Sequence, residues 1–216
     1  MKKAKIIKEV EFVVYSKLFG EGSGHDWYHI DRVRKLALHI ASEDNVDLFL
    51  IELAALLHDI ADWKFNNGDL EAGPNMAKQI LDSLGVSNDL IIKVQNIIRE
   101  VSFKGAGVHI RPNSLEACIV QDADRIDAIG AIGIARCFAY GGKADQLIYD
   151  PQQNTHMHSN FEDYKNSQST SINHFYEKLL LLKDRMNTAR GREIALERDL
   201  FLRNFLNQFF KEWNVE

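Results

Sequence analysis

The sequence predicts an all-α protein. Apolar residues recur three and four positions apart along most of the chain, as they do on one face of an amphipathic helix. Only 3 of the 216 residues are proline, so few positions interrupt such helices. No run of alternating apolar and polar residues is convincing as a strand. We therefore expect a helical bundle with a C-terminal helical extension.

The first three helices are expected from their start and stop signals. One helix covers about 4–18 and stops near Gly20. Asp26 is the predicted N-cap of a second helix over 27–43, which has an apolar face. A third segment, 47–60, is apolar nearly all round, which indicates a buried central helix.

The rest of the chain continues the helical pattern. Further helical segments are predicted at 76–85, 88–101, 114–140, 172–187 and 192–213. The segment 114–140 is interpreted as one long or broken helix. Residues 141–171 are polar and rich in Gly, Asn, Gln and Ser, so we expect a long excursion or lid there. We expect one domain over 1–216, with a core of about 20–140 and a C-terminal helical part of about 171–216.

The composition narrows the class of protein. With 26 basic and 31 acidic residues, the formal charge is −5, which gives no support for a broad nucleic-acid-binding surface. The most apolar stretch, 46–60, is too short and too polar to span a bilayer. Glu9 and Glu11 interrupt the basic N-terminus, which argues against a signal peptide. The two cysteines lack metal-ligand spacing, so a cytoplasmic protein is expected.

The segment "AALLHDIAD" places an imidazole beside a carboxylate in apolar surroundings. Burying His58 and Asp59 together is costly unless something satisfies both groups. A divalent cation does so, because neutral imidazole nitrogen and carboxylate oxygen are both good ligands. The segment alone is equally compatible with a helix C-terminus at which both side chains meet solvent or a backbone group.

A second unusual segment is "VQDADRIDAIGAIG", which holds three aspartates within six residues. Asp124 lies beside the apolar stripe of the expected helix and suits a metal ligand, while Arg125 could reach a phosphate or pair with an acid. The alternative is a capped helix start with a solvated acidic face. His29, His58-Asp59 and Asp124 fall on three predicted helices, which a bundle can bring together.

The order of these residues, with the segments around them, resembles the HD-domain superfamily of metal-dependent phosphohydrolases. The segments are "HDWYHIDRVRKLA", "AALLHDIADWK" and "QDADRIDAIGAIGIAR". "IIREVSFKG" and "HFYEKLLLLKDRMNT" extend the resemblance over nearly the whole chain, to the small bacterial HD hydrolases of the YpgQ and YedJ kind. The resemblance implies an HD-domain helical bundle that binds a metal through His29, His58, Asp59 and Asp124.

The doublet His25-Asp26 is then not the metal doublet. The resemblance implies that Asp26 caps the helix bearing His29 and that His25 lies near the pocket. A ligand set using His25 and His29, four positions apart on one helical face, remains an alternative. Relatives with two metals need extra histidines between the doublet and the last aspartate. Only His109 lies in that interval, which favours one metal.

The implied cofactor is one divalent ion, with Mn²⁺ or Mg²⁺ expected and Co²⁺, Ni²⁺ or Fe²⁺ also compatible. It would acidify a water and neutralise phosphate charge. Asp62, three residues after Asp59, is expected to accept the proton of that water or position it; a plain loop aspartate is the alternative. The expected substrate contacts are His25, Lys64, Lys104 and Arg125. Each of the last three is more often a surface charge than a ligand contact, so only the cluster of them argues for function.

The closest resemblance implies cleavage of nucleoside (deoxy)triphosphates to monophosphate and pyrophosphate. A 5′-nucleotidase acting on nucleoside monophosphates is the alternative, because it needs the same metal and acid. A non-catalytic metal- or nucleotide-binding regulator and a structural helical scaffold are the competing classes. The expected partner is a small phosphorylated molecule, a nucleotide, with no membrane partner and with the chain as a monomer or homodimer.

Overall fold

The structure, a computed structural model, is all-α in the part of the chain that it describes, as the sequence predicts. The described residues are 3–20, 22, 24–43, 45–61, 66, 68–166 and 169–216. The chain divides into two compact units. Unit 1 comprises Met1–Ser102 and Ile110–Asp124, and unit 2 comprises Phe103–His109 and Arg125–Glu216. The single domain expected over 1–216 stays a prediction. Among the described helices, none is long and apolar enough to cross a membrane.

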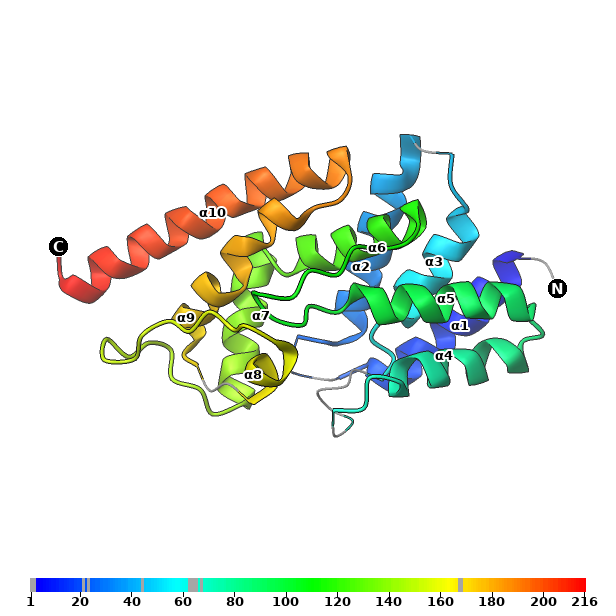
Figure 1. The fold of residues 1–216 in the computed structure, drawn as a ribbon, viewed down its shortest axis with the longest axis horizontal. Coiled ribbons are helices and arrows are strands. Elements are labelled where there is room, and N and C mark those ends of the chain that lie inside the picture. Colours follow the sequence, from blue (N-terminus) through cyan, green and yellow to red (C-terminus); the bar gives the residue numbers. More distant parts are fainter. Residues whose placement is uncertain are drawn as a thin grey trace. The chain divides into compact units, whose positions relative to one another are not determined.

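Unit 1 is built around a buried central helix, α3 (Figure 1). Its elements are α1 (Lys3–Leu18), α2 (Trp27–Ile40), the 3-10 helix η1 (Ala41–Glu43), α3 (Leu48–Leu57), α4 (Ala72–Ser83), α5 (Asn88–Val101) and most of α6 (Leu115–Asp127). α3 packs against α1, α2 and α5, and α4 pairs with α5. Each apolar side chain from Leu50 to Leu57 is buried, which confirms the expectation of a central helix.

Two aspartates fix where the central helices begin. Asp26 is the N-cap of α2, as predicted, and its side chain accepts a hydrogen bond from the backbone N–H of His29. Asp47 caps α3 in the same way, through the N–H groups of Phe49 and Leu50. These side chains satisfy N–H groups that have no partner inside the helix. They therefore set the position of the first turn in each helix.

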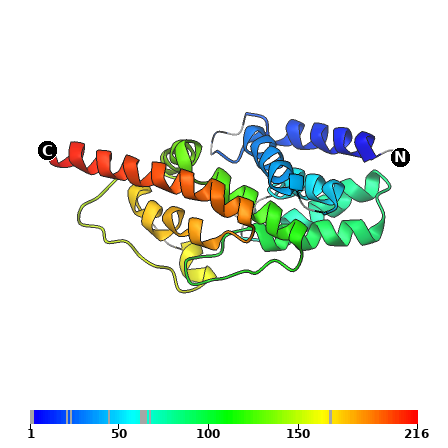
Figure 2. The ribbon, with the colours of Figure 1, turned by 90° about the horizontal axis from the view of Figure 1, so that it is seen from above.

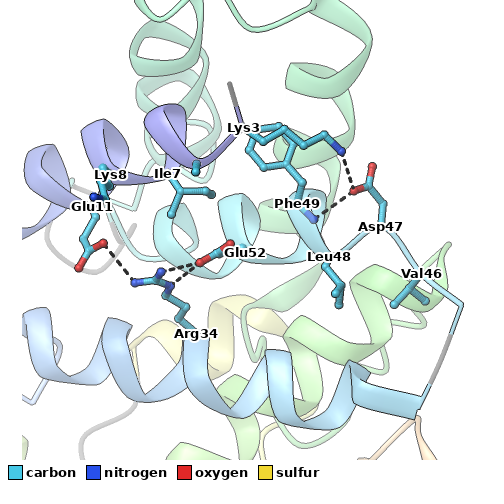
Figure 3. A pocket seen from close by; sticks show the side chains of 11 residues that line it. Lys3, Ile7, Lys8, Glu11, Arg34, Val46, Asp47, Leu48, Phe49 and Glu52 are labelled. Carbon is cyan, nitrogen blue, oxygen red and sulfur yellow. Dashed lines mark hydrogen bonds and ion pairs between the residues drawn. The ribbon is translucent and has the colours of Figure 1, made fainter. Parts of the chain in front are cut away.

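A cavity of about 680 Å³ opens where α1 meets α2 and α3 (Figure 3). Arg34 of α2 lies between two acids there, 3.3 Å from Glu11 of α1 and 2.8 Å from Glu52 of α3. Lys3 and Asp47 form a longer pair at 3.9 Å across the same cavity. The paired charges join α1 to the two central helices. They also leave the cavity with no large excess of either charge.

Unit 2 packs α7, α9 and α10 together. Its elements are the end of α6, α7 (Gly130–Lys143), α8 (Phe161–Asn166), α9 (Ser171–Glu177), the 3-10 helices η3 (Leu179–Leu181) and η4 (Lys183–Arg185), and α10 (Ala189–Asn214). Three buried or half-buried rings form the contact, with centroids 5.6–6.1 Å apart: Phe138 on α7, Phe175 on α9 and Phe205 on α10. Figure 2 shows the wide loop between α7 and α8 that accounts for most of the expected excursion.

The segment 114–140 is broken, the second of the two forms that the sequence allows. α6 ends at Asp127, and α7 begins at Gly130, whose φ of +77° is a left-handed conformation that favours glycine. Helix α7 then extends to Lys143, into the predicted excursion. A lid function of residues 141–171 stays a prediction.

The expected continuous helix over 172–187 is wrong. α9 ends at Glu177, and two short 3-10 helices follow it. Lys178, with φ −141° and ψ −61°, leaves the helical conformation. The buried Leu179 and Leu182 lie three apart, a spacing that the three-residue turn of a 3-10 helix aligns on one face. Apolar spacing alone does not distinguish this arrangement from an α-helix.

Candidate metal centre

His29 is placed by the first turn of α2. Its side chain is fully buried, and its backbone N–H donates to Asp26 Oδ1 at 2.9 Å. The cap therefore fixes the backbone of the residue whose imidazole enters the unit. His29 lies where the sequence expects it, on the helix that Asp26 starts.

The sequence predicts His58 and Asp59 inside a helix over 47–60. In the structure they lie at the C-terminal end of α3, which stops at Leu57. His58 is the C-cap residue, and Asp59 belongs to the turn that follows. The Nδ1 of His58 faces the backbone oxygen of Ala55 at 2.8 Å. A carbonyl only accepts, so Nδ1 carries a proton and donates it, and Nε2 is the nitrogen left to hold a metal. Any residue at position 55 would offer this carbonyl, so no signal in the sequence identifies it.

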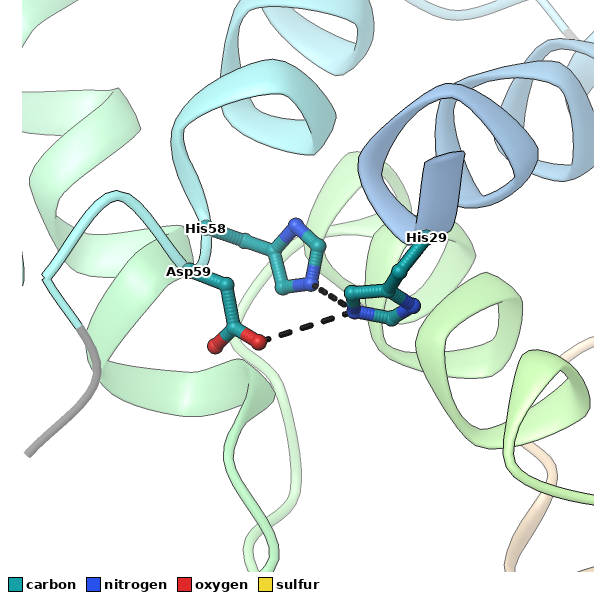
Figure 4. A group of neighbouring side chains, drawn as sticks. All are labelled: His29, His58 and Asp59. Atoms are coloured by element: carbon teal, nitrogen blue, oxygen red, sulfur yellow. Dashed lines mark hydrogen bonds and ion pairs between the residues drawn. The ribbon is translucent and has the colours of Figure 1, made fainter. Parts of the chain in front are cut away.

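The four expected ligands converge within unit 1. The two histidine Nε2 atoms lie 3.2 Å apart, and His29 Nε2 lies 3.5 Å from Asp59 Oδ2 (Figure 4). The ligand atoms of His29, His58 and Asp59 all fall within 4.8 Å of one another. Asp124 enters from α6, with Oδ1 at 3.6 Å from His29 Nε2 and 3.7 Å from His58 Nε2.

These distances fit a divalent cation. An ion about 2.1 Å from each ligand atom separates neighbouring ligands by roughly 3.0 Å at right angles and roughly 3.4 Å at tetrahedral angles. The observed separations are 3.2, 3.5, 3.6 and 3.7 Å, so the first lies within that range and the others exceed it by a few tenths of an ångström. Nitrogen lone pairs and carboxylate oxygens also repel one another unless a positive charge lies between them. The His29, His58 and Asp59 cluster therefore suits a divalent metal ion, and Asp124 as a fourth ligand stays a prediction.

The pKa values show how the same atoms are satisfied by a proton. Burial by itself lowers the pKa of His58, but Asp59, Asp124 and the Ala55 carbonyl together raise it to about 9. Burial raises the pKa of Asp124, and the two histidines outweigh this effect and lower it to about 2. The pKa of Asp59 is held well below its usual range against burial, chiefly by the charge of His58. The centre thus combines two carboxylates with a protonated imidazole at neutral pH.

His25 lies beside the centre. Its ring centroid is 5.9 Å from that of His29, and its charge helps to lower the pKa of Asp59. It lies before the first residue of α2, as expected, and its side chain is half-buried. Among the described residues, the cluster of mutually close ligand atoms is His29, His58 and Asp59, and it contains neither His25 nor Asp124. Asp124 lies within 4.0 Å of both histidine Nε2 atoms, and no such distance places His25 there.

The remaining expected site residues are placed separately. Asp62 and Lys64 lie outside the described residues. Lys104 and Arg125 belong to unit 2, in which Lys104 is half-buried and Arg125 is buried. One guanidinium nitrogen of Arg125 donates to the backbone oxygen of Arg185. The roles of these four residues toward a substrate stay predictions.

The chain is similar in sequence and structure to proteins with an HD domain. A family model described as the HD domain matches residues 26–129. The Bacillus subtilis (strain 168) protein YpgQ is 38% identical over 213 residues, which cover 98% of this chain and 96% of YpgQ. A crystal structure of YpgQ in complex with ADP matches with a TM-score of 0.74 and 34% identity, over 98% of this chain and 97% of that one.

Two further crystal structures match along the whole length of both chains. A Lactobacillus plantarum protein has a TM-score of 0.89 and 34% identity, with 100% of each chain covered. An HD-superfamily hydrolase from Bacillus thuringiensis has a TM-score of 0.74 and 40% identity, again with 100% of each chain covered. The helical arrangement and the sequence therefore agree with the same group of proteins.

Proposed function

The chain belongs to the HD domain family, and from this premise we propose that it hydrolyses nucleoside (deoxy)triphosphates to the monophosphate and pyrophosphate. The coarser statement is established by family and structure: the chain is an HD-superfamily hydrolase with a His/His/Asp cluster suited to a divalent metal. One observation carries the choice of a nucleotide. A relative 38% identical to this chain, YpgQ, has been crystallised in complex with ADP.

The charge of the centre supports a phosphorylated substrate. A divalent cation held by two carboxylates would have no net charge, and it would supply positive charge close to the phosphoryl oxygens on which negative charge develops. His29 and His58 would hold it with neutral nitrogen and so would leave this balance unchanged. The several negative charges of a triphosphate must then be met by other groups of the protein. His25, whose ring lies beside that of His29, is one described residue that can contribute, by donating to a phosphoryl oxygen.

The proton from the attacking water needs an acceptor. Asp59 and Asp124 would serve as ligands, so we assign this role to Asp62, three residues after Asp59 in the sequence. Lys64 and Arg125 remain proposed phosphate contacts on the basis of their positions next to the ligand-bearing segments. Each assignment is tested by a substitution that keeps the size of the side chain, Asp62→Asn and Lys64→Met among them.

The test is a nucleotide panel with product identification. Purified protein loaded with Mn²⁺ is incubated with nucleoside mono-, di- and triphosphates, and phosphate and pyrophosphate are measured separately. We expect pyrophosphate from triphosphates. Phosphate from monophosphates would instead identify a 5′-nucleotidase. Tight nucleotide binding without turnover under Mn²⁺, Mg²⁺, Co²⁺, Ni²⁺ and Fe²⁺ would identify a regulator and overturn the proposed function.

Variants in two histidine positions on one helix separate a metal role from general damage. His29→Ala should abolish metal binding and activity, because it removes one of the converging nitrogen ligands. His39→Ala, in the last turn of the same helix, is the matched control and should leave both unchanged. His25→Ala should lower activity while metal binding is kept. Full activity of a His58→Ala, Asp59→Ala double variant would refute the metal-dependent mechanism.

A further inference from the structure

The loop Phe103–His109 of unit 2 is held by one arginine. Arg185 Nη1 lies 3.3 Å from the backbone oxygen of Gly105 and 3.4 Å from that of Val108, and its Nη2 donates to the oxygen of Ala106. Carbonyl oxygens satisfy the N–H groups of a guanidinium but leave its positive charge in place. The loop therefore encloses a charged group.

Positive charge gathers around the first residue of this loop. The Nζ of Lys178 lies 5.3 Å from the centre of the Phe103 ring, and the Cζ of Arg185 lies 5.1 Å from it. Lys104, half-buried, is the next residue in the chain. The rings of Tyr164 and Phe103 form a T-shaped pair with centroids 5.4 Å apart. An aromatic face attracts a cation without neutralising it, so Phe103 contacts Lys178 and Arg185 and leaves both charges in place.

The acids nearest in sequence do not pair with these cations. Glu177, which precedes Lys178, is buried: its Oε1 accepts from the N–H of His156 and the hydroxyl of Ser169, and its Oε2 has no hydrogen-bond partner among the described residues. Asp184, which precedes Arg185, is 3.9 Å from Lys183. In the described part of the chain, no carboxylate lies within 4.0 Å of Lys104, Lys178 or Arg185.

The pKa of Arg185 is consistent with a guanidinium that has no carboxylate partner. Burial lowers the pKa of Arg185, whereas the pKa of Arg203 is raised by its hydrogen bond to Asp199. A half-buried guanidinium is unfavourable unless an anion compensates for the desolvation, and a second half-buried cation, Lys178, contacts the same ring. Among the described residues of unit 2, Lys104, Lys178 and Arg185 are thus three cations with which no carboxylate pairs.

We propose that Lys104, Lys178 and Arg185, gathered at Phe103, form an anion site that binds phosphoryl oxygens. The choice of a phosphoryl group, rather than another anion, rests on the proposed function, because a pyrophosphohydrolase handles both a polyphosphate substrate and a pyrophosphate product. Arg185 holds the loop and contributes charge, while Lys104 and Lys178 supply the ammonium groups that contact the ligand. The phosphoryl group could belong to free pyrophosphate or to the phosphate chain of a nucleotide.

Calorimetric titration of the metal-stripped, full-length protein tests the site. Sodium pyrophosphate, ADP and adenosine are titrated separately at fixed ionic strength. We expect pyrophosphate or ADP to bind and adenosine not to bind. Binding of pyrophosphate identifies the free anion as a ligand, and binding of ADP alone identifies the nucleotide phosphate chain. Equal binding of adenosine and ADP, or no binding by any of the three, would overturn the proposal.

Lys178→Met is the decisive variant because it keeps a long apolar stem against Phe103 and removes the charge. It should weaken binding at least tenfold, Lys178→Arg should restore most of it, and Lys211→Met on the exposed face of α10 should change nothing. Lys104→Met provides a second, independent loss. Wild-type affinity in both methionine variants, with thermal unfolding unchanged, would refute the site.

One further variant separates the test of the anion site from the test of the proposed function. The His58→Ala, Asp59→Ala protein lacks two metal ligands and should still bind the anion at wild-type affinity. If wild-type protein releases no pyrophosphate from any triphosphate while this variant still binds the anion, the proposed function fails and the site stands. Loss of anion binding in this variant would place the anion at the metal ligands and overturn the site.

Discussion

Raising the pH from 7 to 8 should tighten the binding of Mn²⁺ to this protein by about tenfold. The reason is the proton on His58, whose pKa is raised to about 9 by the neighbouring Asp59 and Asp124 against the effect of burial. Its Nδ1 donates to the carbonyl of Ala55, so the proton that titrates is on Nε2, the atom that would bind the metal. The ion and the proton therefore compete for one nitrogen.

The size of the effect follows from the distance between the pKa and the working pH. A pH of 7 is about two units below the pKa of His58, so the imidazole is almost fully protonated. Nearly one full proton therefore leaves for each ion bound. Displacing it costs about 2.7 kcal/mol at pH 7, which corresponds to about 100-fold in affinity. Asp59 and Asp124 contribute no protons in this range, because their pKa values are lowered.

The assay is calorimetric titration with Mn²⁺ at pH 7.0, 7.5, 8.0 and 8.5, each in two buffers with different ionisation enthalpies. The difference in observed enthalpy between buffers gives the number of protons released. His39→Ala should keep the pH dependence, and His58→Gln should remove the proton release together with most of the affinity. An affinity that does not change between pH 7 and 8, with no proton released, would show that His58 is not protonated at the metal-binding nitrogen.

Three further outcomes test the fold and the centre. Metal-free protein should lose about 3 kcal/mol of unfolding free energy between pH 6.5 and 9. The folded-state pKa of His58 is raised from 6.5 to about 9, so protonation stabilises the fold below pH 6.5 and ceases to do so above pH 9; a flat profile in urea unfolding would contradict this. Asp26→Ala should cost about 1 kcal/mol of stability and weaken Mn²⁺ binding less than loss of His29 does, and equal losses of affinity would count against a purely positioning cap. Gly107→Ala should destabilise the protein by roughly 1–3 kcal/mol because a Cβ would lie 2.6 Å from a facing carbonyl oxygen. Gly142→Ala, at a helical position with open space, should be neutral or stabilise by up to about 1 kcal/mol, and thermal unfolding compares the pair.

The ligand set could be anticipated from the resemblance to HD-domain hydrolases, and the cost of burying an imidazole and carboxylates without a partner supports it. His58 and Asp59 follow an almost wholly apolar segment, and Asp124 lies beside the apolar stripe of its helix. Side chains that must be buried with the core are carried to its interior, so helices that pack together bring them near one another. The cap at Asp26 could also be predicted, since it depends on local backbone geometry and on one side chain.

Features that depend on backbone carbonyl groups cannot be predicted from residue types. The orientation of His58 depends on the carbonyl of Ala55, and the loop 103–109 depends on carbonyls that bind Arg185. Every residue carries such an oxygen, so sequence cannot mark the ones that are used. The change from α-helix to 3-10 turns after Glu177 is hidden for a related reason, because residues three apart share a face in both.

The position of His58 at the C-cap of α3 has a consequence for how the affinity for a metal cation depends on ionic strength. The aligned peptide dipoles of this ten-residue helix place roughly half a negative charge at its C-terminal end. Because α3 is buried, dissolved ions do not screen this field as they screen charges at the surface. Rising ionic strength should therefore loosen the ion pair between Lys3 and Asp47 well before it weakens the hold on a metal.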